Sequence, residues 1–367
     1  MTTSESIVVG SDWISEHYLS SGDKGTFGPE VRKRDRDWAA LEDEGHSTPK
    51  SRFTSGRTRL LQLLTRASES KAVPAKNRAY RKYLDDIEEI LGYVPGRGIQ
   101  VERNGSILWL ARAGNTPSIA VLELVPADTV EDVVSRDGDT LLTPTNPEAE
   151  SYPQPYKESQ TEDGETFTNA ARLTSYLFLN DPKPAFILML AGKWAVLAER
   201  ERWPEGRFLA INLQVVAERN DTRVGREIST AMAALEVESL LPDHEGSAWW
   251  SRQLDESIKH TVGVSKDLRE GVRESIELLA TEVVERRKAQ NLPPLQQEDA
   301  QVLARQALRF LYRILFLLYA EASPELEVLP VGTPEYERGY SLDRLRELVQ
   351  VPLADHESRN GTHLYQS

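Results

Sequence analysis

Acidic side chains in and beside strand-like segments are the residues of this chain that come nearest to a catalytic arrangement. Glu123 lies in the apolar segment SIAVLELV, and Glu88 and Glu89 lie near the end of the helix-like segment before it. Two carboxylates that hold a divalent metal, with a lysine that orients the attacking water, can cleave a phosphodiester bond. Val125 stands where that lysine would be needed, and residues 107–111 contain no acid. With two of the three roles unfilled, we interpret Glu123 as a structural remnant of such a site.

The elements that would position these carboxylates follow an α/β pattern. Apolar residues within 77–91 recur at three- and four-residue steps, as in an amphipathic helix. A second helix is predicted at 166–179, after an acidic, proline-bearing stretch at 128–165 that is typical of a long surface loop. Strands are predicted at 98–103, at 106–112, at 118–125, twice within 184–203 around a type II′ turn at Gly192-Lys193, and within 207–218.

This order of a helix, three strands, a helix and further strands resembles the core of the PD-(D/E)xK nucleases. The resemblance implies a mixed α/β sheet domain at residues 77–223, with a metal site that this chain has lost. An active metal-dependent DNA endonuclease is the alternative interpretation. In that alternative, Glu88 or Glu89 supplies one ligand of a rearranged site.

Residues 1–76 are predicted to form a basic arm of short helices and polar loops. The net charge of the whole chain is −14, yet the segment 24–82 holds 15 basic and only 7 acidic residues. Because lysine and arginine neutralise phosphates and release counterions, a local basic segment can bind DNA even on an acidic protein. The side chains expected to contact DNA are Arg32, Lys33, Arg34, Arg36, Arg52, Arg57, Arg59, Arg78, Arg81 and Lys82.

Residues 224–367 are predicted to be helical and to act as a connector. Leu308 and Leu311 belong to an apolar face of a helix that starts near Asp299, and Phe310 extends the apolar surface around it. We therefore expect this helix to be buried on nearly all sides. Three arginines at four-residue steps line one stripe of the same helix, namely Arg305, Arg309 and Arg313. Pairing with carboxylates of a neighbouring helix is the favoured interpretation of the stripe, ahead of nucleic-acid contact.

Composition narrows the chemistry further. The chain has no cysteine, which excludes disulfides, thiolate metal ligands and a cysteine nucleophile, and which fits a reducing compartment. The first ten residues lack the basic start and long apolar run of a secretory signal. The six histidines show none of the close spacings of a zinc site, so no metal is predicted. We expect a cytoplasmic protein without membrane contact.

Several segments together resemble one protein family. They are DWISEHYLS near the start, TPKSRFTSGR, FILMLAGKWAVLAERERW with RFLAINL, and ARQALRFLYRILFLLYAEASPEL with GYSLDRLRE and THLYQS. The family is the N-terminal region of the large adenine-specific DNA methyltransferases of the type IIG restriction (Eco57I-like) class, including those of BREX and DISARM phage-defence systems. The resemblance implies methyl transfer from S-adenosylmethionine to adenine in DNA by the whole enzyme.

In that family the catalytic domain, with its glycine-rich loop and (D/N)PP(Y/F) motif, follows such a connector. The motif pair does not occur here, so neither cofactor binding nor methylation is expected of this chain alone. The resemblance implies that the chain stops where the catalytic domain would begin, with the connector helix lying beneath it. The expected role is to hold DNA, or partner subunits of a defence system, while that domain acts. A protein-interaction scaffold without DNA contact is a further alternative.

Overall fold

The computed structural model describes residues 6–20, 22, 24–70, 72–96, 98–142, 167–324 and 328–342. It divides into two compact units, Met1–Thr261 and Val262–Ser367. The basic arm and the sheet domain, which the sequence suggests as separate parts, pack together inside the first unit. Residues 143–165 of the predicted surface loop, and residue 166 of the predicted helix that follows, lie outside the described residues. Within the described part of the chain, no helix combines the length and apolar character needed to cross a membrane.

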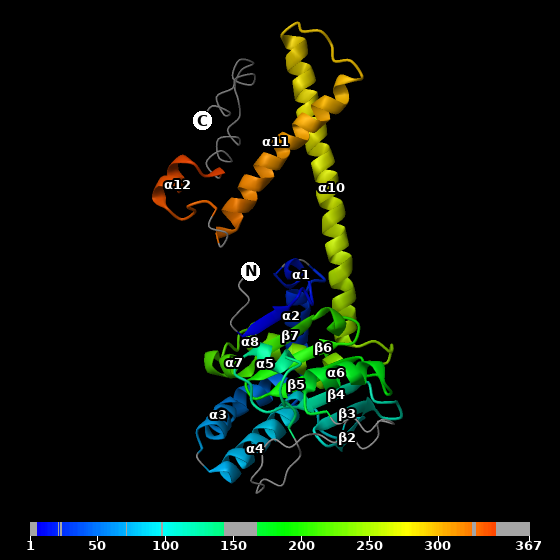
Figure 1. The fold of residues 1–367 in the computed structure, drawn as a ribbon, viewed down its shortest axis with the longest axis vertical. Coiled ribbons are helices and arrows are strands. Elements are labelled where there is room, and N and C mark those ends of the chain that lie inside the picture. Colours follow the sequence, from blue (N-terminus) through cyan, green and yellow to red (C-terminus); the bar gives the residue numbers. More distant parts are fainter. Residues whose placement is uncertain are drawn as a thin grey trace. The chain divides into compact units, whose positions relative to one another are not determined.

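A mixed sheet of seven strands forms the centre of the first unit, in the order β1-β7-β6-β5-β4-β3-β2 (Figure 1). Strands β4 and β5 are parallel, and every other neighbouring pair is antiparallel. Parallel neighbours need a crossover connection, which here carries the helices α5 and α6. The strands are β1 (Ile7–Gly10), β2 (Ile99–Asn104), β3 (Ile107–Arg112), β4 (Ile119–Glu123), β5 (Phe186–Ala191), β6 (Trp194–Glu199) and β7 (Phe208–Asn212). Six of them confirm predicted strands, but the strand predicted within 207–218 ends at Asn212, and the rest of that segment forms helix α7 (Leu213–Arg219). Strand β1 was not predicted.

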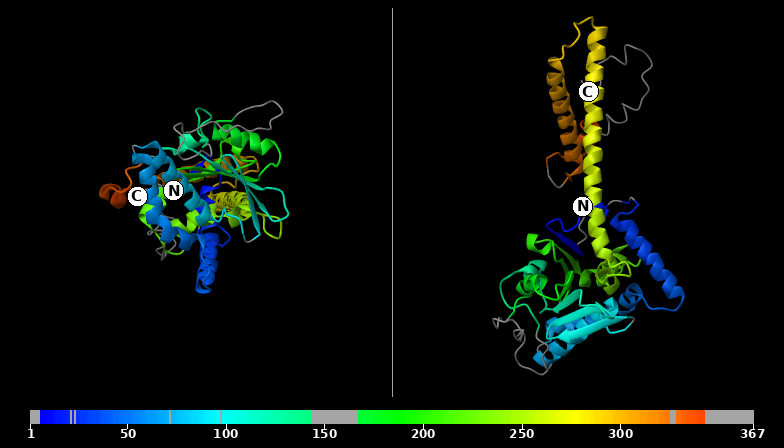
Figure 2. Two further views of the ribbon diagram at one scale, coloured as in Figure 1. Left: turned by 90° about the horizontal axis from the view of Figure 1, so that it is seen from below. Right: turned by 90° about the vertical axis from the view of Figure 1, so that its right-hand side faces the viewer.

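Side chains on the two faces of the sheet enter two different cores, because successive residues of a strand point to opposite faces. In β4, Val121 joins the core to which α3 and α4 contribute, whereas Leu122 joins the core formed with α5 and α6. The two helical layers lie on opposite faces of the sheet (Figure 2). The helices of this unit are α1 (Glu16–Ser20), α2 (Phe27–Asp43), α3 (Pro49–Glu69), α4 (Val73–Leu91), α5 (Val130–Val134), α6 (Ala170–Leu179), the 3-10 turn η1 (Trp203–Glu205), α7 (Leu213–Arg219), α8 (Glu227–Leu235) and α9 (Val237–Leu240).

Local sequence explains where the two longest helices of this layer begin and end. Helix α3 starts at Pro49, and the Thr48 side chain accepts a hydrogen bond from the Ser51 N–H in a capping box. Helix α4 ends before Gly92, whose φ of 85° lies in the left-handed region that glycine adopts without strain. The helix predicted at 77–91 is confirmed within α4. The short helices predicted for the arm are wrong, because α2 and α3 have 17 and 21 residues.

The N-terminal segment is built into the first unit rather than lying apart from it. Strand β1 pairs with β7 and so forms one edge of the sheet. Beyond β1, the rings of Trp13 and Trp250 lie 4.6 Å apart, and Phe27 stacks on Trp250 at 5.5 Å. Trp250 is fully buried near the start of α10 (Trp249–Ala289) and belongs to the core of this unit.

The second unit contains the continuation of α10, with α11 (Asp299–Ala322) and α12 (Pro334–Gly339). The predicted helix from Asp299 is confirmed, but its predicted burial on nearly all sides is wrong for this chain. Only Ala307 and Ala320 are buried in α11, while Phe316 and Tyr319 are about 60% exposed (60% and 61%). The apolar surface of α11 extends around most of the helix, and the described part of the chain covers only part of it.

Two tyrosines of α4 fasten this helix to the sheet. The Tyr80 hydroxyl donates a hydrogen bond to the Leu124 carbonyl at 2.6 Å and accepts one from the Gly192 N–H at 2.9 Å. The Tyr83 hydroxyl donates to the Gly192 carbonyl at 2.7 Å. Gly192 has a φ of 66° and Lys193 does not share the positive φ, as expected for the predicted type II′ turn.

The variant Tyr80→Phe tests how much this attachment contributes. It keeps the ring but leaves the Leu124 carbonyl and the Gly192 N–H buried without this partner, so the free energy of unfolding should fall by about 1–3 kcal/mol. Urea denaturation followed by tryptophan fluorescence measures the change. Tyr312→Phe, at an exposed position of α11, is the matched control and should shift the value by less than about 0.5 kcal/mol. Equal losses in both variants would contradict this role of Tyr80.

Candidate functional site

Glu123 lies in β4 on the sheet face that α4 covers, and its side chain is fully buried. Glu88 of α4 is buried beside it, and two arginines contact both acids. Arg81 Nη2 lies 2.7 Å from Glu123 Oε1 and 3.1 Å from Glu88 Oε1. Arg103 of β2 places Nη2 at 2.8 Å from Glu88 Oε2 and donates through Nη1 to Glu123 Oε1. These four residues are called the carboxylate–arginine cluster below.

Regular secondary structure brings the four side chains together. Arg81 and Glu88 are seven residues apart on α4, which puts them on the same face of the helix two turns apart. Arg103 follows Ile99 and Val101 at two-residue steps, and both of these side chains contact the core on the α4 side. A basic residue on the core-facing side of a strand needs a buried carboxylate as partner. The alternation of Ile99, Val101 and Arg103 is the sequence signal that could have identified Arg103. Arg103 was not among the predicted functional residues.

Ser106 occupies the position opposite Glu123 in the neighbouring chain segment. The register pairs Ile107 with Leu122, and the Glu123 N–H donates to the Ser106 carbonyl at 2.9 Å. A metal site would call for an acid next to Glu123, and serine offers only a hydroxyl. Ser106 Oγ and Glu123 Oε2 are both buried, and neither has a hydrogen-bond partner among the described residues.

The two carboxyl groups of the cluster carry different charges at neutral pH. Burial raises the pKa of Glu88 to about 8, the neighbouring Glu123 adds to the rise, and Arg103 and Arg81 oppose it. Burial alone would also raise the pKa of Glu123, but hydrogen bonds from Arg81 and Glu88 and the charges of both arginines hold it below its usual value. Glu88 therefore keeps its proton while Glu123 is ionised. The cluster as a whole is cationic under these conditions.

This arrangement disfavours a divalent metal at Glu123. The carboxylate oxygens that would bind the ion already bind guanidinium nitrogens, and the positive charge of the cluster repels a second cation. Among the described residues, no three side chains of histidine, aspartate or glutamate come together as metal ligands. Of the two helix acids considered for a rearranged site, Glu88 meets Glu123, whereas Glu89 is exposed. Val125 contacts the core and provides no amine.

Half of the side chains predicted to contact DNA are held by contacts inside the protein. Arg34 pairs with Glu236, Arg81 belongs to the carboxylate–arginine cluster, and Arg52 donates to the Ile90 carbonyl at the end of α4. Arg59 and Lys82 both pair with Asp86 of α4. The other five form no ion pair with a described residue, and they are Arg32, Lys33, Arg36, Arg57 and Arg78. DNA contact by all ten stays a prediction, with these five as the available cations.

Comparisons with known proteins give no match, since no family model, curated protein or solved structure matches this chain. What the fold defines is the class of the first unit, a mixed α/β sheet with helices on both faces.

The variant Glu88→Gln tests the charge state of the cluster. Between pH 4.5, the usual pKa of glutamate, and about 8, the folded protein holds a proton on Glu88 that the unfolded chain releases. Stability therefore falls as the pH rises through this window, because the native state binds more protons than the unfolded state. Glutamine does not titrate. We therefore expect the free energy of unfolding of wild type to fall, relative to that of this variant, by on the order of 2 kcal/mol between about pH 5 and pH 8.

Urea denaturation at a series of pH values measures this difference. The lowered pKa of Glu123 changes the pH dependence of stability only below pH 4.5, outside the range between pH 5 and pH 8. The raised pKa of Glu236 affects wild type and variant alike and cancels in the comparison. Glu89→Gln, an exposed neighbour on the same helix, should follow the wild-type pH curve. Parallel curves for wild type and Glu88→Gln would show that Glu88 is not protonated at neutral pH.

Proposed function

We propose that this chain is a non-catalytic, DNA-holding part of an adenine-specific DNA methyltransferase from a restriction-modification or phage-defence system. The family resemblance of its sequence supports the class of enzyme. The observation that carries the DNA contact is a surface cluster of cations from two distant parts of the chain. It consists of Arg32, Lys33 and Arg36 of α2 and Arg226 before α8, and is called the basic patch below.

Buried Asp35 assembles the basic patch. Its carboxylate accepts hydrogen bonds from the Gly225 N–H at 2.8 Å and the Ser229 hydroxyl at 2.6 Å, and Lys50 Nζ lies 2.7 Å from its other oxygen. Burial would raise the pKa of Asp35, but the bonds from Lys50, Ser229 and Gly225 hold it below its usual value. The ionised Asp35 thus fixes the turn before α8 against α2, next to Arg32 and Arg36.

Gly225 allows the two segments to approach closely. Its φ is 67°, and a Cβ at this position would overlap Arg32 Cγ, so the aliphatic stem of Arg32 lies against the glycine backbone. The guanidinium groups of Arg32, Arg36 and Arg226 are exposed and form no ion pair with a described residue. The charge of Arg226 also acts on nearby Asp221. Exposed cations that form no direct ion pair are suited to the phosphate backbone, which positions a duplex without reading its sequence.

The sheet of the first unit supports descent from a nuclease that no longer cleaves. Helix α4, the antiparallel strands β2, β3 and β4, the crossover through α6 and the parallel strand β5 follow the order expected for a PD-(D/E)xK core. In this proposal, Arg81 and Arg103 hold the acids that once bound metal. The domain keeps its shape and its place near DNA but not its chemistry.

The exposed apolar surface of α11 supports a connector role for the second unit. Phe310, Phe316 and Tyr319 expose large apolar areas, and contiguous exposed apolar surface marks a site of association. The methyltransferase domain is the proposed partner for this surface. That domain, and not this chain, would bind S-adenosylmethionine and transfer the methyl group.

The proposal predicts salt-sensitive binding of duplex DNA through the basic patch. The combined reversal Arg32→Glu, Arg36→Glu and Arg226→Glu should weaken binding by about tenfold or more at low salt. The slope of log K against log salt should fall by about one for each phosphate that the variant no longer neutralises. Fluorescence anisotropy with a labelled duplex at several salt concentrations measures both effects.

Lys183→Glu is the matched control for the removal of a surface cation. Lys183 lies just before β5, and its side chain is half exposed. Strands β5 and β7 run in the same direction, so Lys183 and the start of α7, which follows β7, lie at opposite ends of the sheet. This variant should bind DNA as wild type does. Absence of any duplex binding by wild type would reject the proposed function, and equal weakening in the control would reject the basic patch as its site.

A nuclease assay separates the proposed role from the endonuclease alternative. The purified chain should not cleave plasmid or linear duplex DNA in Mg²⁺ or Mn²⁺, because the acids of the carboxylate–arginine cluster are bonded to arginines. Cleavage that depends on a divalent metal and is abolished in Glu123→Ala would establish the endonuclease instead. Glu89→Ala serves as the control, since Glu89 lies outside the cluster.

A further inference from the structure

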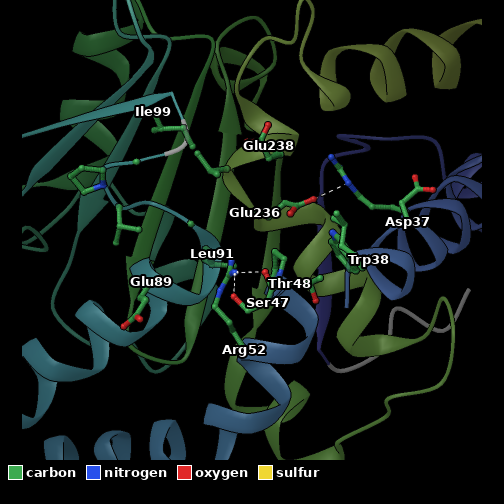
Figure 3. A pocket seen from close by; sticks show the side chains of 18 residues that line it. Asp37, Trp38, Ser47, Thr48, Arg52, Glu89, Leu91, Ile99, Glu236 and Glu238 are labelled. Carbon is green, nitrogen blue, oxygen red and sulfur yellow. Dashed lines mark hydrogen bonds and ion pairs between the residues drawn. The ribbon is translucent and has the colours of Figure 1, made fainter. Parts of the chain in front are cut away.

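A cleft of 510 Å³ opens between α2, the start of α3, the end of α4 and the junction of α8 with α9 (Figure 3). Its volume falls in the range of about 300–1,000 Å³ that is usual for small-molecule sites. It does not include the carboxylate–arginine cluster, and the basic patch does not line it. The apolar side chains that line it are Trp38, Leu41, Leu91, Val94, Ile99 and Val237.

A buried carboxylate, that of Glu236, is among the side chains that line this cleft. Glu236 links the end of α8 to the start of α9 and is only 4% exposed. In Figure 3 its side chain lies between those of Trp38 and Leu91, with Thr48 nearby. Arg34 Nε approaches Glu236 Oε1 to 2.7 Å, but this oxygen receives no hydrogen bond of good geometry.

Arg34 cannot turn further toward Glu236, because other contacts fix its guanidinium group. Its Nη1 donates to the Ser239 hydroxyl, and its central carbon lies 5.0 Å from the centre of the Trp249 ring. Within the described residues, no other cation lies within ion-pair distance of Glu236. Among the described residues, the buried carboxylate of Glu236 thus has one counter-ion, Arg34, which forms an ion pair with Oε1 but no hydrogen bond of good geometry to it.

The charges around the cleft favour a cation over an anion. Four acids line it, Asp37, Glu89, Glu236 and Glu238, against the two arginines Arg34 and Arg52, and Arg112 pairs with Glu238 from outside the lining. Both arginines are turned to internal acceptors, since Arg52 donates to the carbonyls of Ile90 and Ser47. Asp37 and Glu89 are exposed and form no ion pair with a described residue. The cleft therefore offers acceptors and apolar walls, and few free donors.

We propose that this cleft binds a small organic cation, with a guanidinium or ammonium group at Glu236 and an aliphatic stem along Trp38, Leu41 and Val94. A planar guanidinium suits a carboxylate best, because it donates two parallel hydrogen bonds. The stem replaces water along the apolar wall, and that replacement contributes to affinity in proportion to the area covered.

The protonation of Glu236 provides a signature of this binding mode. Burial raises the pKa of Glu236 to about 7, Arg34 opposes the rise, Glu238 adds to it, and Arg52 opposes it. Near neutral pH a fraction of the molecules therefore carries a proton on Glu236. A bound cation stabilises the carboxylate and displaces that proton, so binding at about pH 6.5 should release protons to the buffer.

Four probes that share one stem test the proposal, namely butylguanidinium, butylammonium, butanol and butyrate. Isothermal titration calorimetry of the full chain should show the tightest binding for butylguanidinium, weaker binding for butylammonium, and none for butanol or butyrate. Titrations in two buffers with different ionisation enthalpies should give proton release for the two cations. If butanol bound as tightly as the two cations, the cleft would recognise only the apolar stem, and the proposal would be wrong. Tighter binding of butyrate than of the cations would show that the cleft prefers an anion, which would also overturn the proposal.

Two variants and one control locate the site. Glu236→Gln should weaken butylguanidinium binding by about tenfold or more and abolish proton release. Leu41→Trp fills the cleft from a position that is 44% exposed, and it should block binding while leaving Glu236 itself unchanged. Glu102→Gln, the same substitution at an exposed position of β2 outside the cleft, should change binding less than about twofold and keep proton release.

Thermal unfolding of each variant shows whether the fold is intact. If Glu236→Gln destabilises the protein, Leu41→Trp still decides between the outcomes. If a folded Leu41→Trp variant bound butylguanidinium with unchanged affinity, the proposal would be overturned. The same conclusion would follow if wild type did not bind butylguanidinium at millimolar concentration.

Discussion

The burial of Glu123 under α4 is the constraint from which the arrangement of the first unit follows. An ionised carboxylate with no access to water requires partners, and Arg81 and Arg103 supply them from two different elements. This requirement fixes α4 against β2 and β4 in one register. Helix α3 then packs along α4, and Lys50 of α3 reaches Asp35 of α2, which in turn fixes the turn before α8. Two sets of buried ion pairs, around Glu123 and around Asp35, thus hold the helices that connect the sheet to the basic patch.

The same series explains why charge counting from the sequence gives an incomplete account of the arm. The basic segment 24–82 looks like one positively charged surface, yet several of its cations serve as counter-ions for acids buried by the fold. Arg34 and Glu236 lie about two hundred positions apart in the chain, so no local pattern pairs them. Only the cations left over after internal pairing remain available to a phosphate backbone. Arg226, outside the arm, joins them because Asp35 holds its turn in place.

Elements whose determining interactions are local were predicted correctly from the sequence. The continuous apolar runs of β4 and β5 and the glycine turn at Gly192 are set by neighbours in the chain, and these elements match their predictions. Elements whose partners are distant in the chain were missed. Strand β1 has only four residues and becomes a strand by pairing with β7, about two hundred residues later. The pairing of Glu88, and not Glu89, with Glu123 depends on which face of α4 meets the sheet.

Helix α11 departs from its prediction for a different reason, which bears on function. Its apolar residues were interpreted as a buried surface, but burial needs a partner of sufficient area, and the described part of the chain does not provide one. Exposed phenylalanine and tyrosine side chains on a helix are costly in water, since burying such a side chain contributes roughly 1.5–3 kcal/mol. Several such side chains on one helix therefore form a candidate surface for association. In the proposed function, the partner of this surface is the catalytic domain, and DNA contact is assigned to the first unit.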